Sequence, residues 1–298
     1  MRPEFIGTIA AMRRILPYMI VVLVFASRDA SAQCSDAGAC AVTPMRGEET
    51  DRVPRHTFAL RYSYGSSGAP DDIAFHTLVA EAGSELFDGT RVSMRLPWTS
   101  IEGPLGSASG LGDLTLFLDQ RLWQHSGMEF RAQAGVKFAT GDDNAGGLPQ
   151  AYQPGLGSTD LIVGVSFDAA PWSAALGYQH ATGRSENSLI RLQRGGDLLA
   201  RAGYRTAIDR YSIGIEAIAI QRLSESSIID LAASGTERFM KVPGSDQLQV
   251  NLLGSVSAPL SEHLRLALLA AFPLLQRDVN IDGLKRALTL SAGIEASF

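Results

Sequence analysis

Beyond about residue 32, the sequence lacks any apolar run approaching the roughly 20 residues that a transmembrane helix needs. It also lacks a Gly-x-Ser-x-Gly elbow, a His-Glu-x-x-His motif and a phosphate-binding loop, so common enzyme signatures are missing. Positive charge is not in excess, since 26 lysines and arginines stand against 31 aspartates and glutamates. This balance excludes a nucleic-acid-binding protein of the usual basic kind. Low overall hydropathy does not exclude a membrane β-barrel, because each barrel strand gives only a weak signal.

Cysteine is nearly absent, with only Cys34 and Cys40 in the whole chain. In an oxidising compartment the default for such a close pair is a small local disulfide. A metal site would need further ligands, and the nearest histidine, His56, is distant in sequence. We therefore predict Cys34 and Cys40 as a disulfide candidate, and we predict no metal and no cofactor.

The N-terminus has the features of a secretory signal peptide. Arg13 and Arg14 precede the apolar stretch 15–26, and Ala30-Ser31-Ala32 offers a cleavage site. The apolar stretch is too short for a membrane-spanning helix. We expect residues 1–32 to be a cleaved signal peptide. The segment 33–56, which has no periodic pattern, is expected to be a periplasmic extension.

Alternation of apolar and polar residues dominates the rest of the chain, and the C-terminus shows it best. Every second residue from Leu288 to Phe298 is apolar, and those between them are small or polar. A period of two predicts a β-strand with one apolar and one polar face. A terminal aromatic on the apolar face resembles the C-terminal signal that the outer-membrane barrel-assembly machinery reads. Phe298 is therefore the candidate assembly signal.

Segments with this period recur twelve times over residues 57–298, and each is long enough to cross a bilayer as a tilted strand. We predict an all-β fold, a transmembrane antiparallel β-barrel of about 12 strands. The predicted strands are 57–65, 74–86, 90–98, 113–124, 128–139, 159–168, 172–182, 197–207, 210–222, 246–258, 263–275 and 285–298.

The connections between these segments alternate between long and short. An even strand number with long extracellular loops and short periplasmic turns is the organisation of outer-membrane barrels. A soluble sandwich or lipocalin-like barrel would turn the apolar face inward, and alternation alone does not separate the two. The signal peptide, Phe298 and the alternating connections favour the bacterial outer membrane. The predicted long connections are 66–73, 99–112, 140–157, 183–196, 223–245 and 276–284.

If the apolar face meets lipid, the opposite face lines the lumen, and that face is rich in charge. A lone buried charge is costly, so pairing or water is required. Two arrangements remain open: a mostly paired interior with a restricted path, which we favour, or a water-filled path with a mild preference for anions. The lumen-lining candidates are Arg61, Glu81, Arg91, Arg95, Asp119, Arg121, Glu129, Arg131, Lys137, Arg201, Arg205, Glu216 and Arg265.

Three motifs bear a family resemblance. They are Gly110-Leu-Gly-Asp-Leu-Thr-Leu116, Gly135-Val-Lys-Phe-Ala-Thr-Gly-Asp142 and Gly155-Leu-Gly-Ser-Thr-Asp160. Together they resemble the outer-membrane proteins grouped under the MetA pathway of phenol degradation. The resemblance implies an outer-membrane barrel that transports small solutes, aromatic or hydrophobic ones among them, and it implies no catalytic residues.

Two rival functions remain open. One is a non-conducting structural or adhesive barrel whose long loops act. The other is a lipid hydrolase, because His180-Ala-Thr182 locally resembles the His-x-Ser motif of outer-membrane phospholipases. Such chemistry needs a hydroxyl nucleophile beside an oriented imidazole base. Thr182 replaces the serine and Gly183 replaces an asparagine, so we expect a structural rim histidine.

The favoured function is a passive, porin-like channel and not an enzyme. Its expected partners are outer-membrane lipid and lipopolysaccharide, the barrel-assembly machinery and a small-molecule solute.

Overall fold

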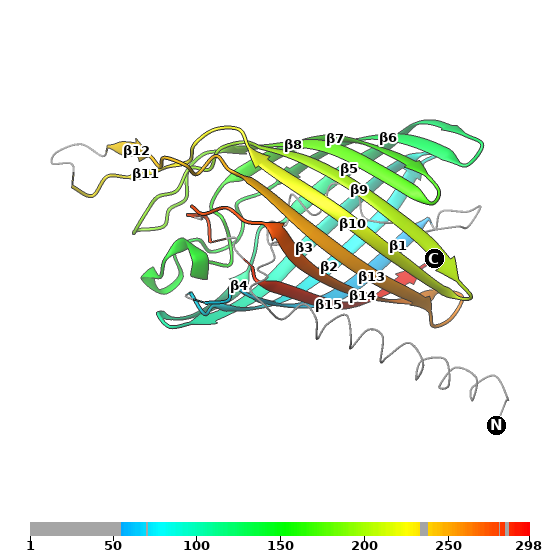
Figure 1. Cartoon of the computed structure of the whole chain (residues 1–298), viewed down its shortest axis with the longest axis horizontal. Coiled ribbons are helices and arrows are strands. Elements are labelled where there is room, and N and C mark those ends of the chain that lie inside the picture. Colours follow the sequence, from blue (N-terminus) through cyan, green and yellow to red (C-terminus); the bar gives the residue numbers. More distant parts are fainter. Residues whose placement is uncertain (1–54, 70, 233–237, 280, 284–285) are drawn as a thin grey trace, which may run out of the picture. The chain divides into compact units, whose positions relative to one another are not determined.

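The computed structural model describes residues 55–69, 71–232, 238–279, 281–283 and 286–298. These residues form a closed barrel of twelve antiparallel strands (Figure 1), so the predicted fold class is confirmed. The barrel closes where β1 pairs with β15, with Thr57 opposite Ser297. The barrel strands are β1 (His56–Ser66), β2 (Ala74–Phe87), β3 (Thr90–Gly103), β5 (Thr115–His125), β6 (Met128–Lys137), β7 (Thr159–Ala169), β8 (Trp172–Thr182), β9 (Asp197–Ile208), β10 (Tyr211–Arg222), β13 (Leu248–Pro259), β14 (Leu264–Leu275) and β15 (Leu288–Ser297).

The outside of the barrel is apolar, as β1 illustrates. Phe58, Leu60 and Tyr62 are 50, 45 and 47 % exposed, whereas Ala59 between them is buried. The same alternation exposes large apolar side chains on β5, β7 and β8. A soluble barrel would hide these side chains, and only lipid satisfies an apolar exterior around a closed backbone. The barrel is therefore a protein of the bacterial outer membrane.

The two ends of the barrel differ as expected. Tight turns join the strands at the end that holds the C-terminus, and long connections join them at the other end (Figure 1). At the C-terminal end the backbone of Phe298 exchanges two hydrogen bonds with His56, at 3.2 and 2.9 Å. The Phe298 side chain is 69 % exposed. The predicted signal peptide and the pair Cys34 and Cys40 lie outside the described residues.

Two predicted loops contain strands. β4 (Gly106–Leu111) pairs with the extended end of β3, inside the predicted loop 99–112. β11 (Ser227–Ile229) and β12 (Phe239–Lys241) form a hairpin inside the predicted loop 223–245, which projects beyond the barrel strands in Figure 1. The sequence did not predict β4 because its glycine and serine residues have a low preference for strands. Hydrogen bonds to the backbone of β3, and not side-chain propensity, stabilise this strand.

Helical structure in the described part of the chain is limited to two single turns. They are η2 (Ala145–Gly147) and η3 (Gln150–Tyr152), both in the connection between β6 and β7. No helix among the described residues is long and apolar enough to cross a membrane.

Candidate functional site: the lumen and its extracellular rim

A cavity of about 380 Å³ lies inside the barrel. Its size falls near the lower end of the range for small-molecule sites, about 300–1,000 Å³. Its lining is more basic than acidic, with seven basic side chains against four acidic ones. The charged lining residues are Arg61, Arg95, Lys137, Arg201, Arg205, Arg265, Arg286, Glu81, Asp113, Asp282 and Glu295.

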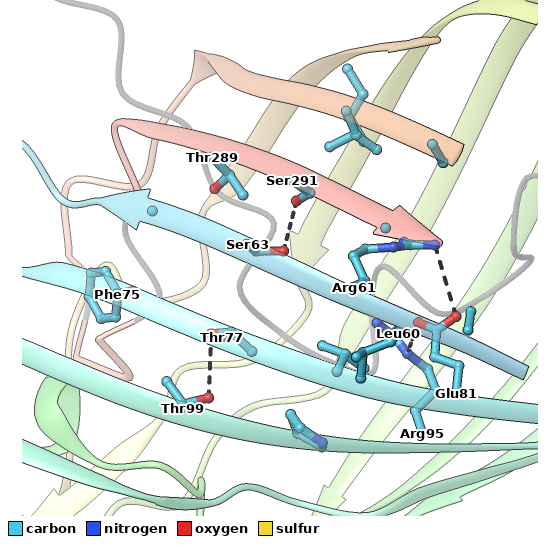
Figure 2. Close-up of a pocket in the computed structure, with 18 of the residues that line it drawn as sticks. Leu60, Arg61, Ser63, Phe75, Thr77, Glu81, Arg95, Thr99, Thr289 and Ser291 are labelled. Atoms are coloured by element: carbon cyan, nitrogen blue, oxygen red, sulfur yellow. Dashed lines mark hydrogen bonds and ion pairs between the residues drawn. The ribbon is translucent and has the colours of Figure 1, made fainter. Parts of the chain in front are cut away.

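One wall of the cavity carries a charged triad from β1, β2 and β3. Glu81 lies between two guanidinium groups, 2.9 Å from Arg95 and 4.0 Å from Arg61 (Figure 2). These side chains share the inward face because register places Glu81 directly opposite Arg95. Two arginines against one carboxylate leave this triad with a net positive charge.

Hydroxyl groups continue this wall toward the extracellular end. The Ser63 and Ser291 hydroxyls are 2.7 Å apart, and those of Thr77 and Thr99 are 3.4 Å apart (Figure 2). Thr289 lines the cavity beside them. Neutral hydroxyls both donate and accept hydrogen bonds, so this wall can replace the water around a polar solute of either charge.

The facing wall carries the arginines of β9. Arg201 forms an ion pair with Glu216 of β10, which is only 2 % exposed. Arg205 lies four residues further along the same strand and lines the cavity as well. Arg265 of β14 completes the basic residues here and lies opposite Glu295 in register.

The charges of β5 and β6 are paired with each other. Arg131 forms ion pairs with Asp119 and Glu129, and Gln133 donates a 2.8 Å hydrogen bond to Asp119. This cluster does not line the cavity, so it matches the paired arrangement and not the open path.

The thirteen sequence-predicted lumen residues therefore divide into two groups. Seven of them line the cavity: Arg61, Glu81, Arg95, Lys137, Arg201, Arg205 and Arg265. The other six lie outside the cavity lining: Arg91, which is buried and bonded to Thr57; Arg121, which pairs with Asp88 in a turn; Asp119, Glu129 and Arg131; and Glu216.

Toward the extracellular end, a buried carboxylate binds two cations. Asp160 of β7 lies 2.7 Å from Lys137 and 3.0 Å from Arg194 of the next long connection. Gln179 and Ser158 donate further hydrogen bonds to the same carboxylate, at 2.5 and 2.7 Å. Asp160 is fully buried and Lys137 is 1 % exposed. Such a charge cluster is stable only with its full set of partners.

A second buried cluster ties the β9–β10 end to the connection between β14 and β15. Arg222 lies 3.0 Å from Asp197 and 2.8 Å from Asp282, and Arg277 lies 3.4 Å from Asp197. We call these four residues the loop latch. Burial alone would raise the pKa of Asp282, but the guanidinium groups of Arg222 and Arg277 lower it below its ordinary value.

The β6–β7 connection packs over the cavity. Tyr152 is 2 % exposed and packs against Ile73, Phe75 and Ile101, which lie at the extracellular ends of β2 and β3. Its hydroxyl accepts a 3.2 Å hydrogen bond from the backbone N–H of Leu105. Gln150 and Gln153 of the same connection line the cavity. The extracellular mouth is thereby narrowed by an ordered segment.

The β8–β9 connection is joined to that segment. Asn187 is fully buried, and its amide donates to the carbonyl oxygens of Asp143 and Leu148 at 3.1 and 2.9 Å. The Asp143 carboxylate in turn accepts the backbone N–H of Glu186. Burial raises the pKa of Asp143.

The three family-like motifs meet in space at the rim. Asp113 accepts the backbone N–H of Gly141 at 3.0 Å and that of Leu156 at 2.9 Å. A Cβ atom on Gly141 would lie 2.8 Å from the Cα of Gly155, so these two backbones pass too closely for a side chain. Thr140 bonds the backbone on both sides of Asp113. The three motifs therefore hold together the segments that precede β5, follow β6 and precede β7.

The residues of the hydrolase hypothesis are not brought together. The Thr182 hydroxyl donates to the carbonyl oxygen of Thr159, and the Nδ1 atom of His180 faces the Tyr178 hydroxyl at 3.4 Å. Asn187 is held in the loop contacts described above. Among His180, Thr182 and Asn187, the Thr182 hydroxyl is therefore bonded to the backbone and not to the imidazole that would have to activate it.

Acid should release the loop latch, because the pKa of Asp282 is lowered in the folded protein. A depressed carboxyl pKa gives stability that is present above its unfolded value and lost as the pH falls through the folded value. A spin label at Asp278→Cys, in a chain with both native cysteines changed to serine, should keep its mobility from pH 8 to 5 and gain mobility below about pH 4. With Asp282→Asn added, the label should be mobile throughout. A change confined to pH 8–5 would contradict this assignment.

Comparisons with known proteins place the fold. No family model matches the sequence, and no curated protein matches it. Among solved structures, the COG4313 outer membrane channel from Pseudomonas putida F1 superposes with a TM-score of 0.62 at 17 % identity, over 86 % of this chain and 100 % of that one. This structural similarity agrees with the geometry described above, and both show that the fold is an outer-membrane β-barrel.

Two further structures are more distant. NanC porin gives a TM-score of 0.49 at 10 % identity, over 81 % of this chain and 100 % of that one. Outer membrane phospholipase A from Escherichia coli gives 0.43 at 10 % identity, over 87 % of this chain and 97 % of that one. Likenesses this loose carry no functional argument.

Proposed function

We propose that this chain is a passive, porin-like channel that admits small solutes across the outer membrane and prefers anions. The observation that carries the proposal is the cavity inside the closed barrel, with seven basic and four acidic side chains on its lining. The family resemblance of the rim motifs adds aromatic or hydrophobic solutes to the expected range. Catalysis has no part in the proposal.

The charge distribution supports anion preference. Rings of arginine and lysine in a pore lower the energy of an anion and raise that of a cation. Low-dielectric walls focus this field and increase the local anion concentration. Because the Tyr152 segment packs over the mouth, the path is narrow and the conductance is expected to be small.

A structural or adhesive barrel is the alternative function. Its lumen would be filled by paired charges, as it is around Arg131. The cavity beside Arg61 and Arg205 argues against complete filling. Assembly through Phe298 and contact with lipopolysaccharide are part of either function.

Single-channel recording in a planar bilayer under a potassium chloride gradient tests the proposal. We expect stable current steps and a reversal potential of the sign for chloride over potassium. Arg61→Gln should move the reversal potential toward zero, because Arg61 lines the cavity. Arg121→Gln, whose arginine pairs with exposed Asp88 outside the cavity lining, is the matched control and should leave it unchanged. A heat-modifiable, folded barrel that never conducts would refute the channel.

A further inference from the structure

We propose that the lumen holds a binding subsite for a small organic monocarboxylate, with Arg205 as the anchor of the carboxylate and an apolar patch on β10, β13 and β14 for the body of the molecule. The subsite deepens the proposed channel function and rests on it. It names the class of solute that would dwell longest in the pore.

The first observation is the charge around Arg205. Its neighbour on the same strand, Arg201, already binds the adjacent carboxylate of Glu216. Among the described residues, the Arg205 side chain has no direct ion pair or hydrogen bond, and the carboxylates of Glu216 and Asp168 act on it only at longer range, although it lines the cavity. Arg265, from β14, lines the same cavity. Guanidinium groups gathered in this way repel each other, and an anion between them relieves that repulsion.

The second observation is the space at this arginine. Gly214 of β10 lies directly opposite Arg205 in register. A Cβ atom at Gly214 would lie 2.7 Å from the Ser255 hydroxyl and 3.6 Å from Nε of Arg205. The glycine therefore leaves the guanidinium open on this side, with a hydroxyl beside it. A planar fork of N–H donors and a nearby hydroxyl match the two oxygens of a carboxylate.

The third observation is an apolar patch on the same wall. Ile218 and Leu253 are 1 and 5 % exposed, and Leu269 packs against them. All three line the cavity. Ile218 lies opposite Arg201 in register, and Leu269 lies opposite Ser255. A molecule whose carboxylate reaches Arg205 therefore places its hydrocarbon part against apolar side chains and not against water.

The size of the cavity limits the solute. A cavity of 380 Å³ falls near the lower end of the range for small-molecule sites, so it suits a single ring or a short chain bearing one carboxylate.

Equilibrium dialysis of radiolabelled benzoate against the refolded full chain in detergent tests the subsite. Benzoate should bind at millimolar concentration, and Arg205→Gln should weaken binding at least tenfold, with Arg205→Lys intermediate. Arg121→Gln should bind as the wild type does. Acetate, which lacks an apolar body, and benzyl alcohol, which lacks the charge, should each compete at least fivefold less well than unlabelled benzoate. A heat-modifiable band in each variant establishes that it is folded.

Equal binding by Arg205→Gln, or equal competition by benzyl alcohol, would overturn the subsite. Dialysis does not depend on conduction, so the two proposals fail separately. A barrel that conducts chloride without binding benzoate refutes the subsite alone. One that binds benzoate and never conducts refutes the channel while leaving the binding site in place.

Discussion

Replacing Asp160 by asparagine is expected to release the β8–β9 connection from the barrel wall. The change leaves Lys137 and Arg194 buried at 1 and 4 % exposure without the carboxylate that both contact. Removing one partner of a buried charge cluster costs about 3–5 kcal/mol. Because Arg194 belongs to a connection and Lys137 to a barrel strand, the cost is expected to fall on the connection, which can move away into water.

Limited trypsin digestion of the refolded barrel measures this release. Cleavage after Arg191 and Arg194 should be at least a hundredfold faster in Asp160→Asn than in the wild type, since local opening by about 3 kcal/mol corresponds to roughly two orders of magnitude. Adding Lys137→Met should restore part of the resistance to trypsin, because it removes one of the two buried cations that have lost their carboxylate partner. Asp142→Asn alters an exposed carboxylate of the same rim and serves as the control. Digestion of Asp160→Asn at the wild-type rate would refute the anchoring role.

The strands could be predicted because lipid imposes a strict rule on them. A lipid-facing wall must be apolar at every second residue, so period two identified β7 (Thr159–Ala169) and β8 (Trp172–Thr182) to within one residue. β4 escaped this rule because it pairs only with the end of β3, beyond the part of β3 that pairs with β5. The small residues of β4 show no period that an isolated sequence can reveal.

The inward face could be predicted from alternation, but the cavity could not. The loops at the extracellular end and the stagger between strands decide which inward residues border the cavity. The alternation of apolar and polar residues in the sequence contains no information on either of them. Arg131 and Arg205 both alternate inward in sequence, yet the first lies within an ion-pair cluster and the second lines the cavity.

The rim contacts were the least accessible to sequence reasoning. Asp113 meets Leu156 across 43 positions of sequence, and the pairing of β5 with β6 and of β6 with β7 brings them together. Arg277 and Asp282 belong to a connection without any periodic pattern. One signal was available for the loop latch: Asp197 and Arg222 stand at the two ends of one predicted strand pair, where antiparallel pairing places them opposite each other.

Replacing Arg222 by glutamine is expected to open the extracellular mouth. The change removes the cation between Asp197 and Asp282, which are 3 and 2 % exposed. The remaining guanidinium, Arg277, lies 3.9 Å from Asp282 and compensates only part of the loss. Two carboxylates with one partner repel each other, and breaking such a cluster costs about 3–5 kcal/mol.

The mouth should widen because the connection between β14 and β15, which the loop latch holds, lies against the Tyr152 segment over the cavity. A Cβ atom at Gly283 would overlap the backbone of Ala151, which neighbours Tyr152 and lines the cavity. Release of the latch removes this support from the Tyr152 segment. Single-channel conductance of Arg222→Gln should therefore rise at least twofold, with more frequent transitions between levels. The exposed residue Lys241 on β12 provides the control, and Lys241→Gln should conduct as the wild type does. Wild-type conductance in Arg222→Gln, together with wild-type resistance to trypsin, would show that the latch does not hold the mouth.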